Sequence, residues 1–472
     1  MGTAALLIDF GSTYTKLRAV DIAARRLLGW GQGPSTVTTD IMVGMRASLA
    51  DLERRLGGLP RFQYRLASSS AAGGLRMVTV GLVRELTAEA ARRAALGAGA
   101  KLVGAFAYRL TLGDIDAVVK LAPDILLLAG GTDGGNRDVL LHNARMLAQS
   151  ALACPVVLAG NRDTTDEART LLAGKDVIAT ENVMPELNVL NIEPARAAVR
   201  QVFIDRIVHA KGIDRAQPEF DAVLMPTPAA VLEGARLVAD GCDGEAGLGP
   251  LMVVDPGGAT TDVHSIATGE PSAPGVIVHG LPEPRVKRTV EGDLGMRHNA
   301  ANIVDVAGID AIAADAGLGA QRTRAIVEEV ARDVGRLPRG LEERAVDQAL
   351  VRAAVRHAVT RHCGTVRTVY AVTGPVAVQE GKDLSNVAAV IGTGGALVHG
   401  ADPRSALAAA LAGPDDPNSL RPKAPRLLLD RHYLLYACGL LASVEPKAAL
   451  ELALRNLEPI DTMSPLEQTH AV

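Results

Sequence analysis

Leu6-Leu7-Ile8-Asp9-Phe10-Gly11-Ser12-Thr13-Tyr14-Thr15-Lys16 is the stretch that decides the fold of this chain. An apolar run ends in an acid, a Gly-Ser-Thr turn follows, and polar and apolar residues then alternate, which predicts a β-hairpin. Gly11 lets the backbone approach a ligand closely, and consecutive N–H groups in such a turn bind anions such as phosphate. Asp9 is a candidate for holding a hydrated cation, and Lys16 is a candidate for reaching an outer phosphate.

A second stretch repeats this pattern far along the chain. Leu251 to His264 again gives an apolar strand, an acid, glycines, threonines and a polar strand. The match predicts a duplicated domain that closes on one polyphosphate, with a cation between Asp9 and Asp255. A third stretch, Val387 to Ala396, is a buried strand that ends in a flexible loop suited to packing against a flat base. The candidate nucleotide-binding residues are Gly11, Ser12, Thr13, Lys16, Gly257, Gly258, Thr260, Thr261, Gly392, Thr393, Gly394 and Gly395.

The composition excludes several classes of protein. The 472 residues are 48% hydrophobic, enough for a sizeable core, but only 3% aromatic, which argues against stacking on single-stranded nucleic acid. A net charge of −4 gives no electrostatic footprint for nucleic acid or an anionic membrane. No apolar run approaches the ~20 residues of a spanning helix, and the first ten residues lack a secretory signal. We expect a cytoplasmic protein without nucleic-acid or membrane partners.

The remaining patterns predict the organisation of the chain. Strands and helices alternate between Lys101 and Ala179, which is typical of parallel α/β sheet. The strand that begins at Arg65 is expected to run into a Ser/Gly stretch and to pair with Met77–Leu82. That stretch is either a tight hairpin of small residues or a loop that lines the nucleotide cleft. Near the C-terminus, the small residues before Leu440 predict a helix that crosses another helix closely. The expected domains are an N-terminal lobe over 1–245, with an α/β portion at about 100–215, a C-terminal lobe over 246–400, and a connector with C-terminal helices over 401–472.

The glycine-rich loop Gly130–Asn136 follows a buried strand, at the end where α/β sheets bind ligands. Its acid, Asp133, has two interpretations. It orients an attacking water, or it caps a helix.

Together, these loops resemble those of the actin-like ATPase superfamily, which includes actin, Hsp70 and sugar kinases. Asp9–Thr13 is similar to the first phosphate motif, Asp255–Thr260 to the second, Gly392–Gly395 to the adenosine motif and Tyr436–Leu440 to a connecting helix. The resemblance implies a duplicated α/β, ribonuclease H-like fold with two lobes around a nucleotide cleft. It also implies ATP or ADP and Mg²⁺ as cofactors, with Asp9 and Asp255 as metal-binding residues.

More narrowly, the chain resembles the MutL family associated with glutamate mutase, also called GlmL. The similar stretches are Ser69–Leu75, Leu128–Asn136, Glu291–Gly295 and Leu429–Tyr433. The resemblance implies an ATP-dependent reactivating chaperone for an adenosylcobalamin-dependent mutase, in which the partner carries the cobalamin. Pro256 departs from the turn of the superfamily's chaperones. A homodimer is left open.

On this hypothesis, the two turns hold the phosphates, Asp9 and Asp255 orient magnesium through water, and one polar group positions the attacking water. Asp133 is a candidate for that group, and which carboxylate takes the role is left open. These three acids are the catalytic candidates. Two alternatives stay open: a small-molecule kinase that uses Asp133 near the γ-phosphate, and an actin-like filament. Substrate-free hydrolysis increased by a mutase, phosphorylation of a metabolite, or ATP-dependent light scattering would distinguish the three.

Overall fold

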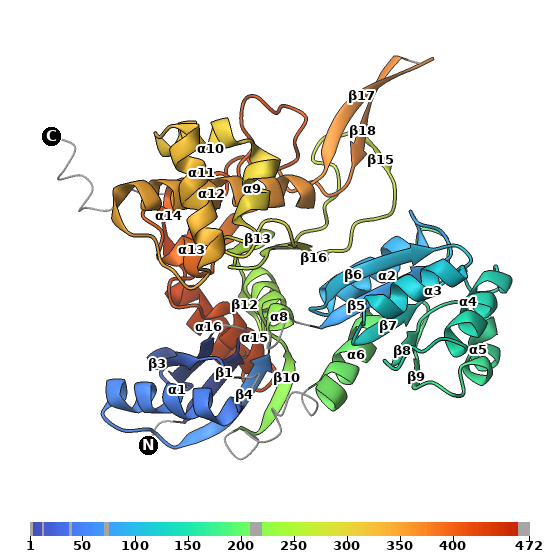
Figure 1. Ribbon diagram of the computed structural model, residues 1–472, viewed down its shortest axis with the longest axis horizontal. Helices are drawn as coiled ribbons and strands as arrows, with labels where there is room; N and C mark the ends of the chain where they lie inside the picture. The colour runs from blue at the N-terminus through green and yellow to red at the C-terminus, as the bar shows by residue number, and fades with distance from the viewer. Residues whose placement is uncertain are drawn as a thin grey trace. The chain divides into compact units, whose positions relative to one another are not determined.

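The computed structural model describes residues 3–11, 14–36, 40–69, 75–207, 220–372 and 374–460 (Figure 1). The chain forms two compact units. Unit 1 comprises Met1–Gly234 and Tyr436–Leu452, and unit 2 comprises Ala235–Leu435 and Ala453–Val472. The chain passes between the units within α8 (Thr227–Asp240), at the start of α15 (Leu435–Leu441) and within α16 (Pro446–Asn456).

The first sheet of unit 1 is built around the N-terminal strand. Its elements are β1 (Ala4–Phe10), β2 (Tyr14–Asp21), β3 (Arg26–Pro34), β4 (Phe62–Ser69) and β10 (Ala222–Pro226), with helix α1 (Ile41–Leu56). The order is β10-β4-β1-β2-β3. β2 is antiparallel to β1 and β3, while β4 is parallel to β1 and β10. The predicted first hairpin is therefore confirmed.

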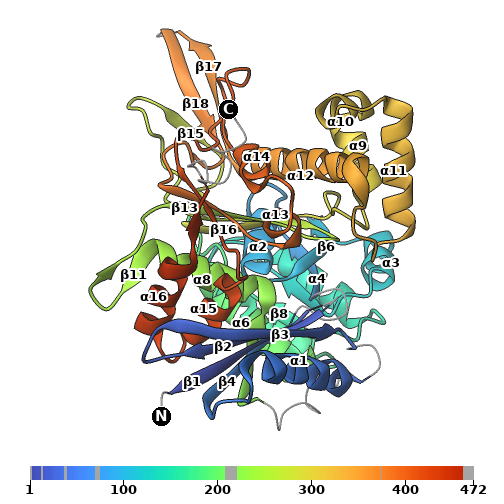
Figure 2. The ribbon, with the colours of Figure 1, turned by 90° about the vertical axis from the view of Figure 1, so that its left-hand side faces the viewer.

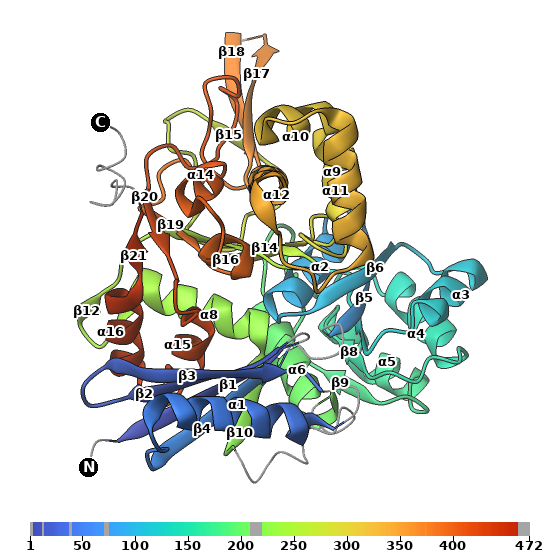
Figure 3. The same cartoon turned by 60° about the vertical axis from the view of Figure 1, so that its left-hand side comes forward.

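Both faces of this sheet are covered, which explains why every residue of β1 is buried. Figures 2 and 3 show α1 lying along one face. Asp40 caps the start of α1 by accepting a hydrogen bond from the Met42 N–H, and Gly57 ends it in a left-handed conformation. On the other face, the Tyr436 hydroxyl of α15 donates to the Leu7 carbonyl at 3.3 Å.

The main sheet of unit 2 repeats this plan. Its strands are β13 (Leu251–Pro256), β14 (Thr261–Ile266), β16 (Val286–Glu291), β19 (Ala389–Gly392), β20 (Arg426–Leu429) and β21 (Glu458–Pro459). The order β16-β14-β13-β19-β20, followed by β21, matches β3-β2-β1-β4-β10 of unit 1. The strand directions also match, with β14 antiparallel to both of its neighbours, and β13, β19 and β20 parallel. The predicted duplicated α/β fold is therefore confirmed.

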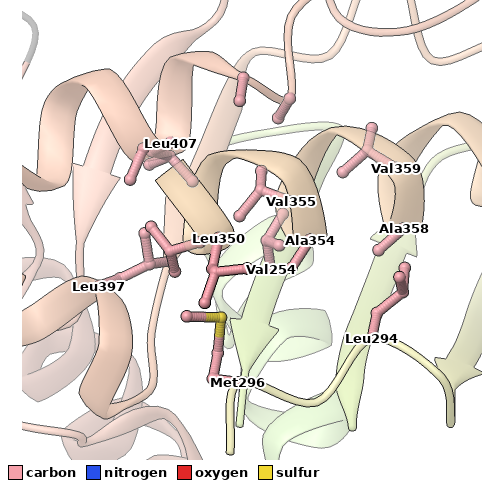
Figure 4. Packing of buried hydrophobic residues seen from close by; sticks show 14 of the residues in the cluster. Val254, Leu294, Met296, Leu350, Ala354, Val355, Ala358, Val359, Leu397 and Leu407 are labelled. Carbon is pink, nitrogen blue, oxygen red and sulfur yellow. The ribbon is translucent and has the colours of Figure 1, made fainter. Parts of the chain in front are cut away.

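The core of unit 2 lies between this sheet and a group of helices. The helices are α9 (Ala300–Ala307), α10 (Ile309–Ala316), α11 (Ala320–Arg332), α12 (Gly340–His362), α13 (Gly395–Val398) and α14 (Pro403–Ala408). Figure 4 shows Leu350, Ala354 and Val355 of α12 packed over Val254 of β13 and beside Met296. The apolar face of α12 thus buries the strand that carries the second predicted turn.

Unit 1 also contains a parallel five-stranded sheet. Its strands are β5 (Arg76–Gly81), β6 (Lys101–Ala107), β7 (Ile125–Leu128), β8 (Val156–Leu158) and β9 (Val177–Ala179). The associated helices are α2 (Thr87–Gly97), α3 (Leu112–Lys120), α4 (Asp138–Ala148), η2 (Arg162–Thr164), α5 (Thr165–Leu171), α6 (Glu193–Val202) and η3 (Phe203–Ile207). The order is β6-β5-β7-β8-β9, with every pair parallel, so the predicted alternation is confirmed.

The predicted hairpin between the strand at Arg65 and Met77–Leu82 is wrong. β4 joins the first sheet, parallel to β1, whereas β5 is the second strand of the parallel sheet, between β6 and β7. Every residue of β5 after Arg76 is buried, and a strand buried on both faces is typical of parallel pairing rather than of a local hairpin.

Two smaller features complete the fold. Unit 2 carries a three-stranded sheet of β15 (Ile277–His279), β17 (Thr365–Ala371) and β18 (Gly374–Glu380), and a short hairpin of β11 (Gly241–Cys242) and β12 (Glu245–Ala246). In unit 1, α15 crosses α8 so closely that a Cβ on Gly439 would lie 1.9 Å from the Ala230 carbonyl oxygen. The predicted close helix crossing is confirmed.

Candidate functional site

The first predicted turn joins β1 to β2, and its glycine fixes its shape. The Gly11 N–H donates to the Tyr14 carbonyl at 3.1 Å, and the Gly11 carbonyl accepts from the Ser35 hydroxyl at 2.7 Å. A Cβ on Gly11 would lie 2.5 Å from the Tyr14 oxygen, so the turn requires glycine there. Ser12 and Thr13, which were also predicted to bind nucleotide, lie outside the described residues.

Asp9 ends β1 as a buried carboxylate that is 2% exposed. Its Oδ1 accepts a 2.6 Å hydrogen bond from the Thr227 hydroxyl, which also lies 3.2 Å from Ser68 Oγ. Lys16 Nζ lies 3.9 Å from Asp9 Oδ2. Burial raises the pKa of Asp9 above its ordinary value, although Lys16 and Thr227 oppose the shift by stabilising the charged form. The carboxylate is thus held at the carboxyl ends of β1, β4 and β10, where sheets of this kind bind ligands.

The second predicted turn joins β13 to β14 and has the same closing hydrogen bond. The Gly257 N–H donates to the Thr260 carbonyl at 2.8 Å, as Gly11 does to Tyr14. The carbonyls of Gly257 and Gly258 accept from the N–H groups of Met296 and Arg297 at 3.0 and 2.9 Å. Each turn is therefore braced from outside, the first by a hydroxyl and the second by backbone.

The two turns differ in charge at the position that faces the strand-ending acid. Lys16 pairs with Asp9 in the β1–β2 register, whereas Asp262 pairs with Asp255 in the β13–β14 register. Asp262 is neutralised by Arg288 of β16, whose Nε lies 2.8 Å from Asp262 Oδ1. The predicted residue Thr261 is turned inward and donates to the Leu294 carbonyl at 2.6 Å, while Thr260 donates to Asp262 Oδ2 at 3.1 Å.

The predicted adenosine loop reaches the second turn within unit 2. The Thr393 N–H donates to the Val254 carbonyl at 3.0 Å, and the Thr393 hydroxyl donates to Asp430 Oδ2 at 3.2 Å. A Cβ on Gly394, at φ 86°, would lie 2.3 Å from Asp255 Oδ1. The structure thus brings together Asp255, the turn at Gly257 and the loop from Gly392 to Gly395, which begins α13.

Asp133 belongs to the parallel sheet, in the loop that follows β7. Its Oδ1 accepts hydrogen bonds from the Arg162 N–H at 3.0 Å and from Asn182 Nδ2 at 2.9 Å. Because Arg162 begins η2, the carboxylate holds the start of this short helix. The role of Asp133 in orienting water stays a prediction.

Sequence reasoning missed Thr227, Arg288 and Asp430 as site residues, whereas Ser68 belongs to the stretch for which a cleft-lining loop is one interpretation. The carboxylate of Asp430 accepts from the Leu434 and Leu435 N–H groups at 2.7 and 3.0 Å as well as from Thr393. The signal that could have found two of them is positional, because Thr227 and Asp430 lie just beyond the carboxyl ends of β10 and β20.

Two features of the described residues bear on cofactors and partners. They include no group of three or more His, Cys, Asp or Glu side chains that could hold a metal ion, so Asp9 and Asp255 as magnesium ligands stay a prediction. Among the helices in the described part of the chain, none combines the length and apolar character needed to cross a membrane.

Residues 5–457 match the MutL protein family. The protein MutL of Clostridium tetanomorphum is 46% identical over 450 residues, which span 95% of this chain and 97% of that protein. Among solved structures, the gluconate kinase of Lactobacillus acidophilus is 10% identical, with a TM-score of 0.36 over 99% of this chain and 95% of that chain. The xylulose kinase of Bifidobacterium adolescentis is 12% identical, with a TM-score of 0.30 over 98% and 95%. Both TM-scores are too low to carry an argument.

Proposed function

The chain belongs to the MutL protein family, and we propose that it binds ATP with Mg²⁺ and uses ATP hydrolysis to reactivate an adenosylcobalamin-dependent mutase. The observation that carries the nucleotide proposal is the pair of matched turns. Each follows a strand-ending acid, and each closes with a hydrogen bond from a glycine N–H to the carbonyl three residues later. Such turns bind the oxygens of phosphate with backbone N–H groups.

In this proposal, the residues of unit 1 bind one side of a polyphosphate. Lys16 supplies positive charge, and the turn at Gly11 supplies backbone donors. The Asp9 carboxylate is held by the hydroxyl of Thr227 at the start of α8, which in turn lies 3.2 Å from the Ser68 hydroxyl of β4. A side chain held by packing and hydrogen bonds needs no reorganisation when the ligand binds.

The residues of unit 2 have the complementary task. The turn at Gly257 and Gly258 binds phosphate, and the loop from Gly392 to Gly395 packs against the adenine base. Because Gly394 has no Cβ, this loop can lie directly against the Asp255 carboxylate. Asp430 steadies the loop through the Thr393 hydroxyl.

The residues of both turns fit a magnesium ion by their chemistry. Mg²⁺ prefers carboxylate oxygens and bound water, and Asp9 and Asp255 offer carboxylates. The buried Asp9 carboxylate has a raised pKa, so a nearby cation would offset the cost of its desolvation. Bound magnesium would neutralise charge on the phosphates.

The partner in this proposal is a cytoplasmic mutase such as glutamate mutase, and its support is family membership. Hydrolysis would change the arrangement of the two units and so remodel the bound mutase until its damaged cofactor leaves.

Calorimetry with the full chain, ATP and Mg²⁺ tests the nucleotide proposal. We expect binding heat in the wild type and an ATP affinity about tenfold weaker in Lys16→Ala, since a partly buried cation that contacts phosphate contributes about 1.5–3 kcal/mol. The matched control is Lys101→Ala, because Lys101 is an exposed lysine of β6 in the parallel sheet. Absence of heat in the wild type, or equal weakening by both variants, contradicts ATP binding at these turns.

The chaperone role needs a second measurement. We expect slow hydrolysis by the chain alone, increased when inactivated glutamate mutase is added, with recovery of mutase activity only when ATP is present. ATP binding without recovery would leave the nucleotide site intact and contradict the chaperone role. Phosphorylation of an added metabolite would contradict the chaperone role and favour a kinase. Light scattering that depends on ATP would contradict it and favour a filament.

A further inference from the structure

Unit 2 carries a hairpin that the proposed nucleotide site does not use. β17 and β18 pair antiparallel from Thr365↔Glu380 to Ala371↔Gly374, and β15 adds a parallel strand beside β18. Figures 1 and 3 show this hairpin standing away from the helices of unit 2. Its outer end is apolar, with Tyr370 84% exposed and Val372 fully exposed. Large exposed apolar side chains that gather at one place mark interaction surfaces.

One edge of β17 is open over most of its length. At its base, the Val366 N–H donates to the Asn418 carbonyl at 2.8 Å, so the N–H of Val366 points away from β18. Because N–H directions alternate along a strand, the N–H and C=O groups of Thr368 and Tyr370 also point away from β18. Tyr370 lies opposite Pro375, which has no N–H to offer it. Within the described chain, no hydrogen bond reaches these four outward groups.

The edge also lacks the features that keep strand edges apart. Natural edge strands are protected by lysines, prolines, bulges or inward charges. β17 has the sequence Thr-Val-Arg-Thr-Val-Tyr-Ala, whose single charge is Arg367, and its pairing with β18 has an unbroken register. Such a strand is complementary to another strand of low charge.

We propose that a second copy of this chain pairs with β17 through its own β17, antiparallel, with the two-fold axis at Val369. This register places Thr368 of each copy opposite Tyr370 of the other, so that all outward N–H and C=O groups of both residues pair, in four backbone hydrogen bonds. Arg367 then lies opposite Ala371 of the other copy. The two three-stranded sheets join into one sheet of six strands.

The neighbouring registers are worse for identifiable reasons. An axis at Arg367 sets two arginines directly opposite each other, which is destabilising. An axis at Thr368 needs the outward groups of Val366, whose N–H is bound to Asn418. An axis at Tyr370 pairs Thr368 with Val372, which lies beyond the end of β17. The axis at Val369 is therefore the register in which the edge complements itself, and this self-complementarity favours a second copy over a foreign strand.

Sedimentation of the full chain tests the pairing, and its result does not depend on nucleotide binding. We expect a dimer for the wild type, and a dimer dissociation constant raised roughly tenfold or more by Thr368→Pro. Proline there removes an outward N–H and leaves the β17–β18 ladder intact. The control is Thr368→Ser, which keeps the N–H and should dimerise as the wild type does. Circular dichroism should be the same for both variants, which shows that both fold.

Cysteine cross-linking tests the register. In the proposed dimer, the two Val369 residues form a non-hydrogen-bonded pair, whose Cα atoms lie about 4.5 Å apart, within reach of a disulfide. We expect Val369→Cys to give a covalent dimer under mild oxidation, and Arg367→Cys, on the same strand, to give no more than the wild type. A monomeric wild type, dimers unaffected by Thr368→Pro, or equal cross-linking at both positions overturns the proposal. The proposal is also overturned if the chain is a monomer that binds a different protein through Thr368, because the edge of β17 would then be a binding site for that protein.

Discussion

The turns at Gly11 and Gly257 close with the same hydrogen bond, but the residues opposite their strand-ending acids have opposite charges. Both close with a glycine N–H on the carbonyl three residues later, at 3.1 and 2.8 Å. Facing the strand-ending acid, unit 1 has Lys16, which is partly exposed, while unit 2 has Asp262, which is neutralised by the buried Arg288. The comparison teaches that both units keep the closing hydrogen bond of the turn, while the charge opposite the acid differs. In unit 1 that charge is a partly exposed lysine, which we propose contacts the ligand, and in unit 2 it is an aspartate paired with a buried arginine.

The largest expected effect is therefore on stability, at Asp262. The side chains of Asp262 and Arg288 are 14% and 4% exposed. Asp262→Ala leaves the arginine buried without this counter-charge, which costs about 3–5 kcal/mol. Lys16→Ala removes a looser pair at 3.9 Å, and it should cost less because the buried Asp9 carboxyl, whose pKa is already raised, can take up a proton when the cation is lost. Hydrogen exchange of the amides in β13 and β14, and in β1 and β2, measures the two effects separately.

The control for this prediction is the double variant Asp262→Ala with Arg288→Leu. It replaces the buried pair by apolar groups, so it should recover much of the lost stability. Equal losses for Asp262→Ala and Lys16→Ala would show that the two positions are equivalent after all.

A smaller loss of stability is expected for a substitution at Gly394, where the loop after β19 lies against Asp255. Gly394 has φ 86° and ψ 153°, a region that essentially only glycine occupies, and a Cβ there would lie 2.3 Å from Asp255 Oδ1. Gly394→Ala should therefore destabilise the loop by about 2–3 kcal/mol and weaken ATP binding in calorimetry. The matched control for the loss of stability is Gly395→Ala, because a Cβ on Gly395 meets nothing within 4 Å and alanine favours the helix α13. It is compared with Gly394→Ala in stability alone, since Gly395 belongs to the proposed nucleotide loop. The prediction fails if the two alanines behave alike.

The parts of the site that could be predicted from the sequence are those that neighbouring residues encode. An apolar strand, an acid and a glycine turn lie within a few residues of one another at Asp9 and again at Asp255, so both hairpins could be predicted, and their repetition predicted the duplicated fold. The groups that bind these acids could not be predicted in the same way. Thr227, which binds Asp9, is separated from it by 218 positions. Arg288, which binds Asp262 beside Asp255, lies on a strand whose neighbour is set by sheet order.

The wrong hairpin has the same cause. β4 and β5 follow one another in the sequence and both have buried C-terminal halves, but no local pattern indicates which sheet each strand joins. That choice depends on which partners bury both faces of each strand, and those partners lie far along the chain. β4 pairs with β1 and β10, while β5 pairs with β6 and β7.

The smallest expected effect is on the pH dependence of stability, and it contrasts one acid of each unit. Burial raises the pKa of Asp9 above 3.8, so the folded state holds its proton to higher pH than the unfolded state does. The Asp9 contribution to the free energy of unfolding therefore falls as pH rises from about 3.8 through the folded pKa. In unit 2, Arg361 binds Asp293 at 2.7 and 2.9 Å and holds the pKa of Asp293 below 3.8.

The Asp293 contribution is thus present above pH 3.8 and is lost as pH falls through its folded pKa. Denaturant unfolding of Asp9→Asn and Asp293→Asn across this range should give differences from the wild type that change in opposite directions. With rising pH, Asp9→Asn should gain stability relative to the wild type, and Asp293→Asn should lose it. Differences that run in the same direction would mean that Lys16, the Thr227 hydrogen bond and Arg18 together outweigh the desolvation of the Asp9 carboxylate, so that the pKa of Asp9 in the folded protein is lowered and not raised.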